Sequence, residues 1–367
     1  MNKHFAETSR SSAVAENVTE DIIIDILLRL PVKSLMRFKC VSKRWRSLIS
    51  DQHFAKLHLE RVISENVAPS QKIIKSNPLQ TIDYEALDSD EVNDRAVVKS
   101  HDLGGDEPWG LAGSCHGLVS LAVCDGFLVY DPTTKESRKL PASDLVAEHE
   151  LFLGFGYNSA TDDYKILHGA FFKANDGSKK CVSEIFSLRF GSWRWVPCKD
   201  VPKVGGVGIY LNGAVHWIVN HGSGNRTEQA IIPFGLATET FEEAIPTPRV
   251  EGIVFEGLGI YGGCLLIYDV TFRISFEAWI MNKYGKGESW TRLFSIPTDG
   301  LPGHQFYTIP IAYTRSGKIV FQIDVSEMIL FNPEDGTYKN YPIEEDDNVE
   351  SVAYVETLVS PYVGRDQ

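Results

Sequence analysis

Residues 127–132 read Phe127-Leu128-Val129-Tyr130-Asp131-Pro132, and a turn leads from them to Leu140-Pro141. The segment combines a short apolar strand, a turn, a post-turn residue and a hydrophobic residue beside a proline. Four later segments have the same shape, and their post-turn residues follow at spacings of 56, 48, 49 and 48 residues. The five post-turn residues are Ser137, Trp193, Phe241, Trp290 and Tyr338. This recurrence indicates a repeated structural unit.

A second landmark has the same period. The turn glycines of the preceding hairpins are Gly117, Gly213, Gly263 and Gly317, and the 96-residue gap between the first two is twice 48. A hairpin over residues 155–167 fills that gap. A period of 45–50 residues with about four strands per unit is typical of β-propeller blades, whereas a sandwich or barrel has no reason to repeat in this way.

The number of strands predicts the number of blades. About 23 short apolar runs lie between Ile73 and Val359, which favours six four-stranded blades. The runs at residues 71–84 and 349–359 are then expected to meet where the ring closes. The predicted fold is therefore a β-propeller preceded by a short helical module.

Composition limits the other possibilities. The 367 residues are 43% hydrophobic and 23% charged, as in ordinary globular proteins. The sequence has no run of 18 apolar residues, so we expect no transmembrane helix and no membrane partner. Residues 1–17 lack the apolar stretch of a signal peptide, and we expect the protein in the cytoplasm or nucleus.

The six cysteines are scattered, with no Cys-x-x-Cys pair. In a reducing compartment this pattern favours small buried side chains. We therefore expect no disulfide, no structural zinc and no other metal or cofactor. The cysteines are Cys40, Cys115, Cys124, Cys181, Cys198 and Cys264.

A change in composition near residue 65 marks the expected domain boundary. Residues 18–62 contain no glycine and one proline, Pro31, whereas all 30 glycines lie further along the chain. We expect a disordered tail at 1–17, a helical module at 18–62, a linker with the first blade strands at 63–108, and the propeller at 109–367, closed with strands from 71–84.

The first predicted helix is unusually apolar. Seven of the nine residues from Ile22 to Leu30 are large aliphatic residues, Thr19 is a suitable N-cap, and Pro31 ends the helix. A helix that is apolar all round must be covered all round. Some 45 residues bury too little surface to do this alone, so either the propeller or another protein must cover it.

The next segment adds an apolar stripe and a basic rim. Two short helices are expected, the second capped by Ser42, with the stripe formed by Leu35, Phe38, Val41, Trp45, Leu48 and Ile49. Residues 29–46 carry seven lysines and arginines and no acid, so the rest of this chain of net charge −13 carries −20. An apolar face with a charged rim is the anatomy of an interface.

Two stretches resemble known families. Residues 18–58, which include Leu30-Pro31-Val32-Lys33-Ser34-Leu35, resemble the F-box, although Val18-Thr19 stands where such motifs often begin Leu-Pro. The later half is similar to the F-box-associated, kelch-type domain of plant proteins of the immunity-linked or S-locus type. It carries the matching segments in order, among them Gly113-Ser114-Cys115-His116-Gly117-Leu118 and Asn212-Gly213-Ala214-Val215-His216-Trp217.

The resemblance implies a function. It implies a non-catalytic substrate receptor that docks on a Skp-family adaptor, and through it on cullin, and presents a target protein for ubiquitination and proteasomal degradation. The residues expected to contact the adaptor are Ile22, Ile26, Leu30, Pro31, Leu35, Val41, Lys43, Trp45, Leu48 and Ile49. The alternative for Trp45, Leu48 and Ile49 is the internal core of the module, a role that can coexist with adaptor contact. The alternative for the basic residues is a solvated helix face.

Three other functions remain as alternatives. A scaffold that binds a target without degradation has the same sequence features. A propeller enzyme is disfavoured because catalytic motifs are absent and His116, His216 and Cys264 lie in strand-like runs. A nucleic-acid-binding regulator is disfavoured by the charge of −20 outside residues 29–46.

The sequence does not identify the target protein. Propellers bind partners through loops on one rim, and five loops are candidates, although each has the composition of ordinary turns. They span residues 102–109, 142–150, 174–180, 221–228 and 300–305.

Overall fold

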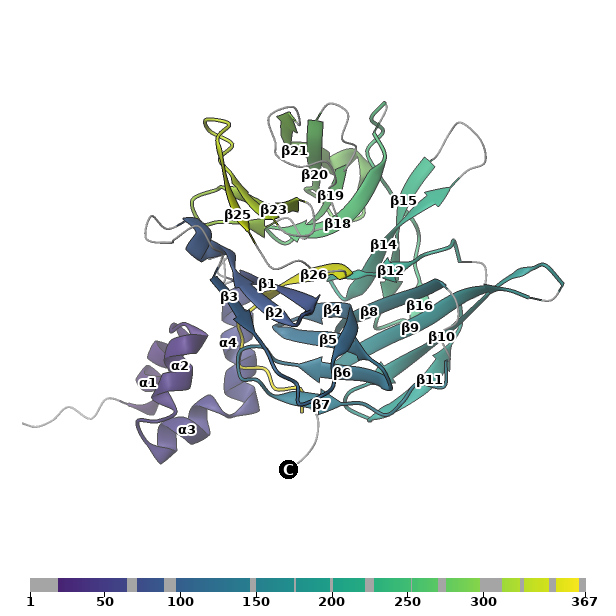
Figure 1. Ribbon diagram of the computed structural model, residues 1–367. Helices are drawn as coiled ribbons and strands as arrows, with labels where there is room; N and C mark the ends of the chain where they lie inside the picture. Colours follow the sequence, from purple (N-terminus) through teal and green to yellow (C-terminus); the bar gives the residue numbers. More distant parts are fainter. Residues whose placement is uncertain are drawn as a thin grey trace, which may run out of the picture.

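The computed structural model describes residues 19–64, 71–88, 97–145, 150–174, 176–198, 201–221, 228–251, 253–269, 275–297, 312–323, 327–342 and 348–362. Within these ranges the chain forms four N-terminal helices followed by a six-bladed β-propeller, as predicted (Figure 1). No helix within them is long and apolar enough to span a membrane.

Six sheets form the blades. The first blade contains β26 (Asn348–Val355), β1 (Gln71–Asn77), β2 (Gln80–Asp83) and β3 (Val97–Ser100). The second blade contains β4 (Pro108–Cys115), β5 (Leu118–Val123), β6 (Gly126–Tyr130) and β7 (Ser137–Lys139). The third blade contains β8 (Glu150–Asn158), β9 (Asp163–Lys173), β10 (Lys179–Ser187), β11 (Ser192–Val196) and β12 (Gly206–Val207). The fourth blade contains β13 (Ile209–Leu211), β14 (Ala214–His221), β15 (Glu228–Gly235), β16 (Thr240–Phe241) and β17 (Ile245–Pro246). The fifth blade contains β18 (Phe255–Tyr261), β19 (Cys264–Asp269), β20 (Ser275–Met281) and β21 (Trp290–Pro297). The sixth blade contains β22 (Ala312–Tyr313), β23 (Ile319–Ile323), β24 (Glu327–Phe331) and β25 (Tyr338–Pro342). Two short 3-10 helices, η1 (Tyr84–Asp88) and η2 (Gly287–Ser289), lie between strands.

The first blade joins the two ends of the propeller chain. β26 pairs antiparallel with β1, and Gln71 lies opposite Val355 and Ile74 opposite Val352. In Figure 1 the yellow β26 lies beside the dark blue β1. The pairing satisfies strand edges that an open ring would leave exposed.

The sequence landmarks have fixed places in the blades. The post-turn residues lie on β7, β11, β16, β21 and β25, which are the outermost strands of their blades or pair near that edge. The turn glycines lie between the first two strands, and Gly117, Gly213, Gly263 and Gly317 have φ of 87°, 81°, 75° and 85°. Positive φ favours glycine, which explains why this residue type marks the repeat.

The helical module contains α1 (Glu20–Leu28), α2 (Val32–Phe38), α3 (Lys43–Ile49) and α4 (Gln52–Ser64). Ser42 caps α3 by accepting a hydrogen bond from the Trp45 amide at 3.1 Å, and Asp51 accepts one from the Phe54 amide at 3.0 Å. Thr19 occupies the N-cap position of α1, but its side chain makes no capping hydrogen bond. The prediction of capping by the Thr19 side chain was therefore wrong.

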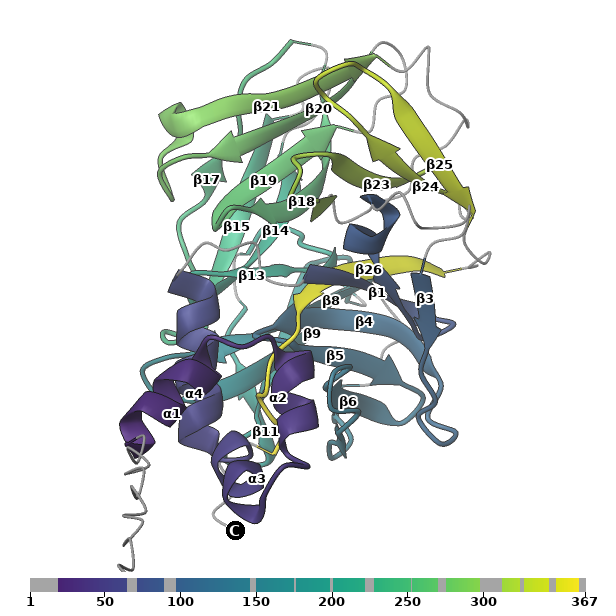
Figure 2. The ribbon, with the colours of Figure 1, turned by 90° about the vertical axis from the view of Figure 1, so that its left-hand side faces the viewer.

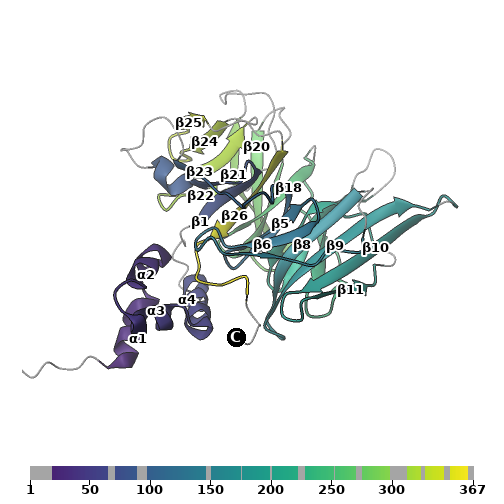
Figure 3. The same cartoon turned by 60° about the horizontal axis from the view of Figure 1, so that its bottom comes forward.

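The module sits beside the propeller, with α4 closest to the blades and α1–α3 on the far side (Figures 1 and 2). After β26 the chain continues as residues 356–362, which run past α4 along the second blade. Figure 3 shows this yellow segment descending from β26 between α4 and the blades. We call residues 356–362 the C-terminal strap.

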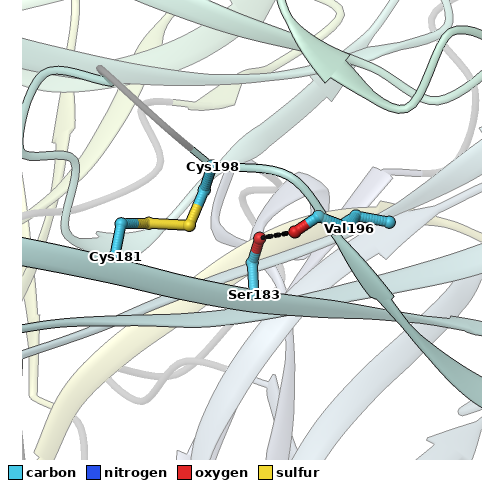
Figure 4. The surroundings of a disulfide bond; sticks show 4 residues. All are labelled: Cys181, Ser183, Val196 and Cys198. Atoms are coloured by element: carbon cyan, nitrogen blue, oxygen red, sulfur yellow. Dashed lines mark hydrogen bonds between the residues drawn. A yellow bond between two sulfur atoms is a disulfide. The ribbon is translucent and has the colours of Figure 1, made fainter.

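The cysteine prediction was wrong in two respects. Cys181 on β10 and Cys198, two residues after β11, form a disulfide that encloses a sequence separation of 17 (Figure 4). Of the other cysteines, only Cys115 is buried, whereas Cys40 and Cys124 are exposed. The sequence spacing gave no sign of the pairing, because it depends on two adjacent strands bringing distant residues together.

Candidate protein-binding surface

The helical module has its own small core. It is formed by Leu27, Val32, Leu35, Ile49, Phe54, Ala55 and one residue of the C-terminal strap, Leu358. Leu35 and Ile49 are 0% and 1% exposed, so these two predicted contact residues lie in the interior and hold the helices together. The interpretation of Ile49 as internal core matches its position.

Other predicted contact residues lie on the surface. The side chains of Ile22, Ile26 and Val41 are 51%, 52% and 63% exposed, and Pro31 is also exposed. Ile22 and Ile26 lie one helical turn apart on α1, and therefore on the same face. Exposed aliphatic side chains of this size on one small module leave apolar area that a partner can bury.

Leu30, Trp45 and Leu48 are half-buried and pack against the module core. The Trp45 ring lies against Phe38, with ring centroids 5.3 Å apart. These residues therefore contribute to the interior on one side while remaining reachable from the other, which is compatible with both roles considered for Trp45 and Leu48.

The basic residues divide into paired and unpaired groups. Arg29 bonds Asp25 at 2.8 Å within α1, Arg44 reaches Glu20 at 2.7 Å and so links α3 to α1, and the Arg46 side chain donates to a main-chain carbonyl. Lys33, Arg37 and Lys43 are exposed and form no ion pair with the residues that the structure describes. The module therefore exposes three cations as well as aliphatic side chains, a combination suited to an acidic, apolar partner. We call Ile22, Ile26, Pro31, Val41, Lys33, Arg37 and Lys43 the helical docking surface.

Contacts with the second and third blades fix the module to the propeller. Lys56 of α4 bonds the Asp162 carboxylate of the third blade at 3.1 Å. Burial lowers the pKa of Lys39, and the carboxylates of Glu136 and Asp131 on the second blade act in the opposite direction, so Lys39 lies close to that blade. Leu59 of α4 packs with Val359 in a core cluster shared with the second and third blades. The docking surface is therefore held in a defined orientation to the blades.

The C-terminal strap was not foreseen. Residues 349–359 were expected to meet residues 71–84 where the ring closes; β26 does so, but it ends at Val355 and the strap follows it. Thr357 donates a hydrogen bond from its hydroxyl to the His116 carbonyl at 2.9 Å, and Leu358 enters the helical core. Val355, Leu358 and Val359 are all apolar, as strand residues often are, and only tertiary contact distinguishes the strap from the strand.

The residues considered as possible catalytic groups have structural roles in the propeller. His116 bonds the Tyr164 hydroxyl at 3.1 Å, and burial lowers the pKa of His116 to about 4. His216 is bonded through both ring nitrogens, and Cys264 lies at the start of β19. Across the described ranges, no cluster of three or more His, Cys, Asp or Glu side chains is arranged to hold a metal ion.

The predicted target loops are described to different extents. Residues 102–109 are described throughout. The candidate loops at 142–150, 174–180 and 221–228 are described in part, and the loop at 300–305 lies outside the described residues.

Comparisons with known proteins match both parts of the chain. The model of the F-box domain matches residues 16–57, and the model of the F-box associated beta propeller domain matches residues 109–361. An F-box/kelch-repeat protein of Arabidopsis thaliana is 30% identical over 97% of this chain and 99% of its own length. The F-box protein CPR1 of the same plant is 27% identical over 86% of this chain and 81% of its own length.

Proposed function

Because the chain belongs to the F-box proteins that carry an F-box associated beta propeller domain, we propose that it is the substrate-recognition subunit of an SCF-type ubiquitin ligase. In this proposal the helical module docks on a Skp-family adaptor and through it on cullin. The propeller binds a target protein, which is then ubiquitinated and degraded by the proteasome. The protein itself catalyses no step and acts in the cytoplasm or nucleus.

One observation carries the proposal most directly: the helical docking surface combines three aliphatic side chains that are more than half exposed with three unpaired cations. Burying the exposed half of one such side chain is worth on the order of 1 kcal/mol, so a partner with an apolar groove and acidic rim gains from each contact. Leu30, Trp45 and Leu48 lie at the edge of the proposed contact, and the buried Leu35 and Ile49 hold the helices together beneath it.

The rigid attachment of the module supports the same role. A substrate receptor must hold its target in a fixed place relative to the adaptor. The strap, the Lys56–Asp162 ion pair and the shared core cluster join the helices to the second and third blades. We infer that target position is set by these contacts and not by a flexible tether.

The test measures adaptor affinity of the full-length chain. We expect Ile26→Asp to weaken binding to a Skp-family adaptor by about tenfold or more, since it removes apolar contact and places an acid before an acidic partner. Ile63→Asp on α4 is the matched control, because Ile63 is 57% exposed but lies outside the docking surface. Equal loss in both variants, or none in either, would argue against docking through this surface.

A second measurement separates degradation from scaffolding. Proteins that co-purify with the wild-type chain while the proteasome is inhibited should be enriched relative to untreated cells, and the Ile26→Asp variant should abolish that difference. Partners whose abundance does not change under inhibition would favour the non-degradative scaffold.

A further inference from the structure

The described residues leave a cavity of about 450 Å³ between the second and third blades. Its walls are largely apolar and come from both blades, with Trp109, Val123 and Phe127 on one side and Leu151 and Leu153 on the other. Cavities of this size bind small ligands or single side chains of a partner. Described residues of two candidate target loops line this cavity: Trp109 of the loop at 102–109, and Ala142 and Ser143 of the loop at 142–150.

A buried polar chain forms one side of the cavity. The Ser143 hydroxyl lies within hydrogen-bond distance of both the Glu184 carboxylate and His168 Nδ1, the latter at 2.9 Å. A carboxylate only accepts, so the single Ser143 proton points to Glu184 and the Ser143 oxygen accepts from His168 Nδ1–H. In the tautomer that carries its proton on Nδ1, the ring leaves Nε2 as an acceptor.

His168 lines the cavity and is 5% exposed, and its Nε2 makes no hydrogen bond with any described residue. A ring nitrogen that lines a cavity and has no partner among the described residues can accept a hydrogen bond from a ligand. The arrangement differs from a catalytic triad, because serine and glutamate both lie on the Nδ1 side of the ring, where the His168 Nδ1 to Glu184 distance is 3.5 Å.

The charged side chains around the cavity favour a ligand of one sign of charge. Asp125 lines the cavity, Asp144 is exposed next to Ser143, and the buried Glu184 bonds Ser143 and lies 3.5 Å from His168 Nδ1. The nearby cation Lys139 is shared between Asp106 at 2.7 Å and Asp125 at 3.1 Å, so one positive charge faces two carboxylates. The local balance is negative and complements a cationic ligand.

Exposed tryptophans flank the same region. Trp109 on β4 is 44% exposed at the cavity. On the third blade, strand pairing places Leu153, His168, Glu184 and the exposed Trp195 in one row across β8, β9, β10 and β11. Tryptophan is the residue type most often found at binding hot spots and attracts cations to its ring face.

We propose that this cavity binds a lysine or arginine side chain from an extended segment of the target protein. The aliphatic stem packs between the two apolar walls, the cationic head donates to His168 Nε2 and faces Asp125, and Trp109 covers the mouth. This inference rests on the proposed function in that it supplies the site through which the propeller selects a target.

The test selects ligands for the full-length chain from a displayed library of random twelve-residue peptides. The expected result is enrichment of arginine or lysine at one position. In a labelled peptide from that selection, Trp109→Ala and Asp125→Asn should each weaken binding by about threefold to tenfold. Tyr338→Ala is the matched control, since Tyr338 is similarly exposed on the distant β25, and it should leave affinity within about twofold.

Further arms make the result decisive. Replacing the basic residue of the peptide by norleucine should cost as much as Trp109→Ala, and His168→Phe, with an unchanged melting temperature, should remove the preference for a basic residue. Selection of no peptide, selection of acidic or purely apolar peptides, or binding unaffected by Trp109→Ala would overturn the proposal. Adaptor affinity measured on the same variants should stay unchanged, so failure of docking through Ile26 and failure of this site are separate outcomes.

Discussion

At the scale of single residues, His216 illustrates how the propeller holds a titratable group neutral. The side chain is fully buried, its Nδ1 donates to the Ile209 carbonyl at 3.1 Å, and its Nε2 accepts from the Tyr284 hydroxyl at 2.6 Å. Burial lowers the pKa of His216 to about 4. Both nitrogens of the neutral ring are therefore hydrogen-bonded. A proton added to Nε2 would break the hydrogen bond that this atom accepts from Tyr284.

This burial predicts a loss of stability in acid. Because the pKa of His216 is lower in the folded than in the unfolded chain, the unfolded state takes up the proton first, and stability falls as pH falls from about 6.5 towards 4. Between pH 7 and pH 5 this one histidine should cost about 2 kcal/mol of unfolding free energy. Urea denaturation at both pH values measures the drop, which His216→Gln should reduce by that amount.

Other groups do not obscure this comparison. His101 and His116 also have pKa values lowered to about 4 by burial, and burial raises the pKa of Asp131 to about 6, which acts in the opposite direction. These contributions are the same in wild type and variant. An identical pH dependence in the two proteins would contradict the role given to His216.

Two turn glycines form a second matched pair. A Cβ added at Gly117 would lie 2.3 Å from the Thr357 hydroxyl oxygen and 2.7 Å from the Val355 carbonyl, whereas one at Gly213 would meet nothing within 4 Å. Both residues have positive φ, so Gly→Ala strains each backbone by about 1 kcal/mol. We expect Gly117→Ala to cost about 1–3 kcal/mol more than Gly213→Ala in thermal or urea unfolding, because it also displaces the strap.

If the two variants lose the same stability, the contact between the first turn of the second blade and the strap contributes nothing beyond backbone strain. Hydrogen exchange in α4 provides an independent readout. It should increase in Gly117→Ala and stay unchanged in Gly213→Ala, because only the first variant disturbs the segment that packs on the helices.

At the scale of elements, the third blade is the one that departs most from the repeat. Its post-turn residue follows the previous one by 56 residues where the others follow by 48 or 49, and β9 and β10 are 11 and nine residues long. The disulfide between Cys181 and Cys198 lies at the end of this long hairpin. It joins β10 to the chain that leaves β11, where backbone pairing has ended at Val196.

Closing a loop of this length should stabilise the protein by about 3 kcal/mol. We expect Cys198→Ser to lose that amount in urea unfolding under oxidising conditions, and added reductant to bring the wild type to the same value. Cys264→Ser is the control, since Cys264 is not disulfide-bonded. Labelling of the unfolded, unreduced protein should find the four thiols of Cys40, Cys115, Cys124 and Cys264; six reactive thiols would refute the pairing.

At the scale of the whole molecule, one strand closes the ring. β26 supplies Val352 and Tyr354 to a core cluster that also contains Ile74 of β1 and Leu121 of β5. The first blade therefore depends on chain segments about 280 residues apart, and the strap that follows β26 joins this closure to the helical module. Ring closure and the placement of the docking surface are thus connected through the same C-terminal segment.

This arrangement predicts the effect of a truncation. A chain ending at Asp347 lacks β26 and the strap, which exposes β1 as an edge and uncovers the cores of the first two blades. We expect loss of the cooperative unfolding transition and aggregation on expression. A chain ending at Tyr362 is the control and should unfold as the full-length protein does. Calorimetry compares them, and a cooperative transition in the shorter chain would contradict closure by β26.

The sequence by itself determined the repeat, and hence the architecture. Alternating apolar runs need burial on two faces, and glycines at positive φ recur because four of the six blades place a glycine in the turn between their first two strands. Likewise, the apolar density of residues 22–30 and the cations of 29–46 predicted an interface module, since both are properties of local sequence. The capping roles of Ser42 and Asp51 were also predictable, because a cap acts within three residues.

Only the tertiary structure decided which side chains of that module are free. Leu35 and Ile26 are equally apolar in sequence, yet one is interior and the other exposed, because α4 and Leu358 cover one side of the helices and not the other. The disulfide, the strap and the cavity at His168 depend in the same way on segments far apart in the chain. Contacts of that kind arise from how the blades and helices meet, and no local pattern of residues encodes them.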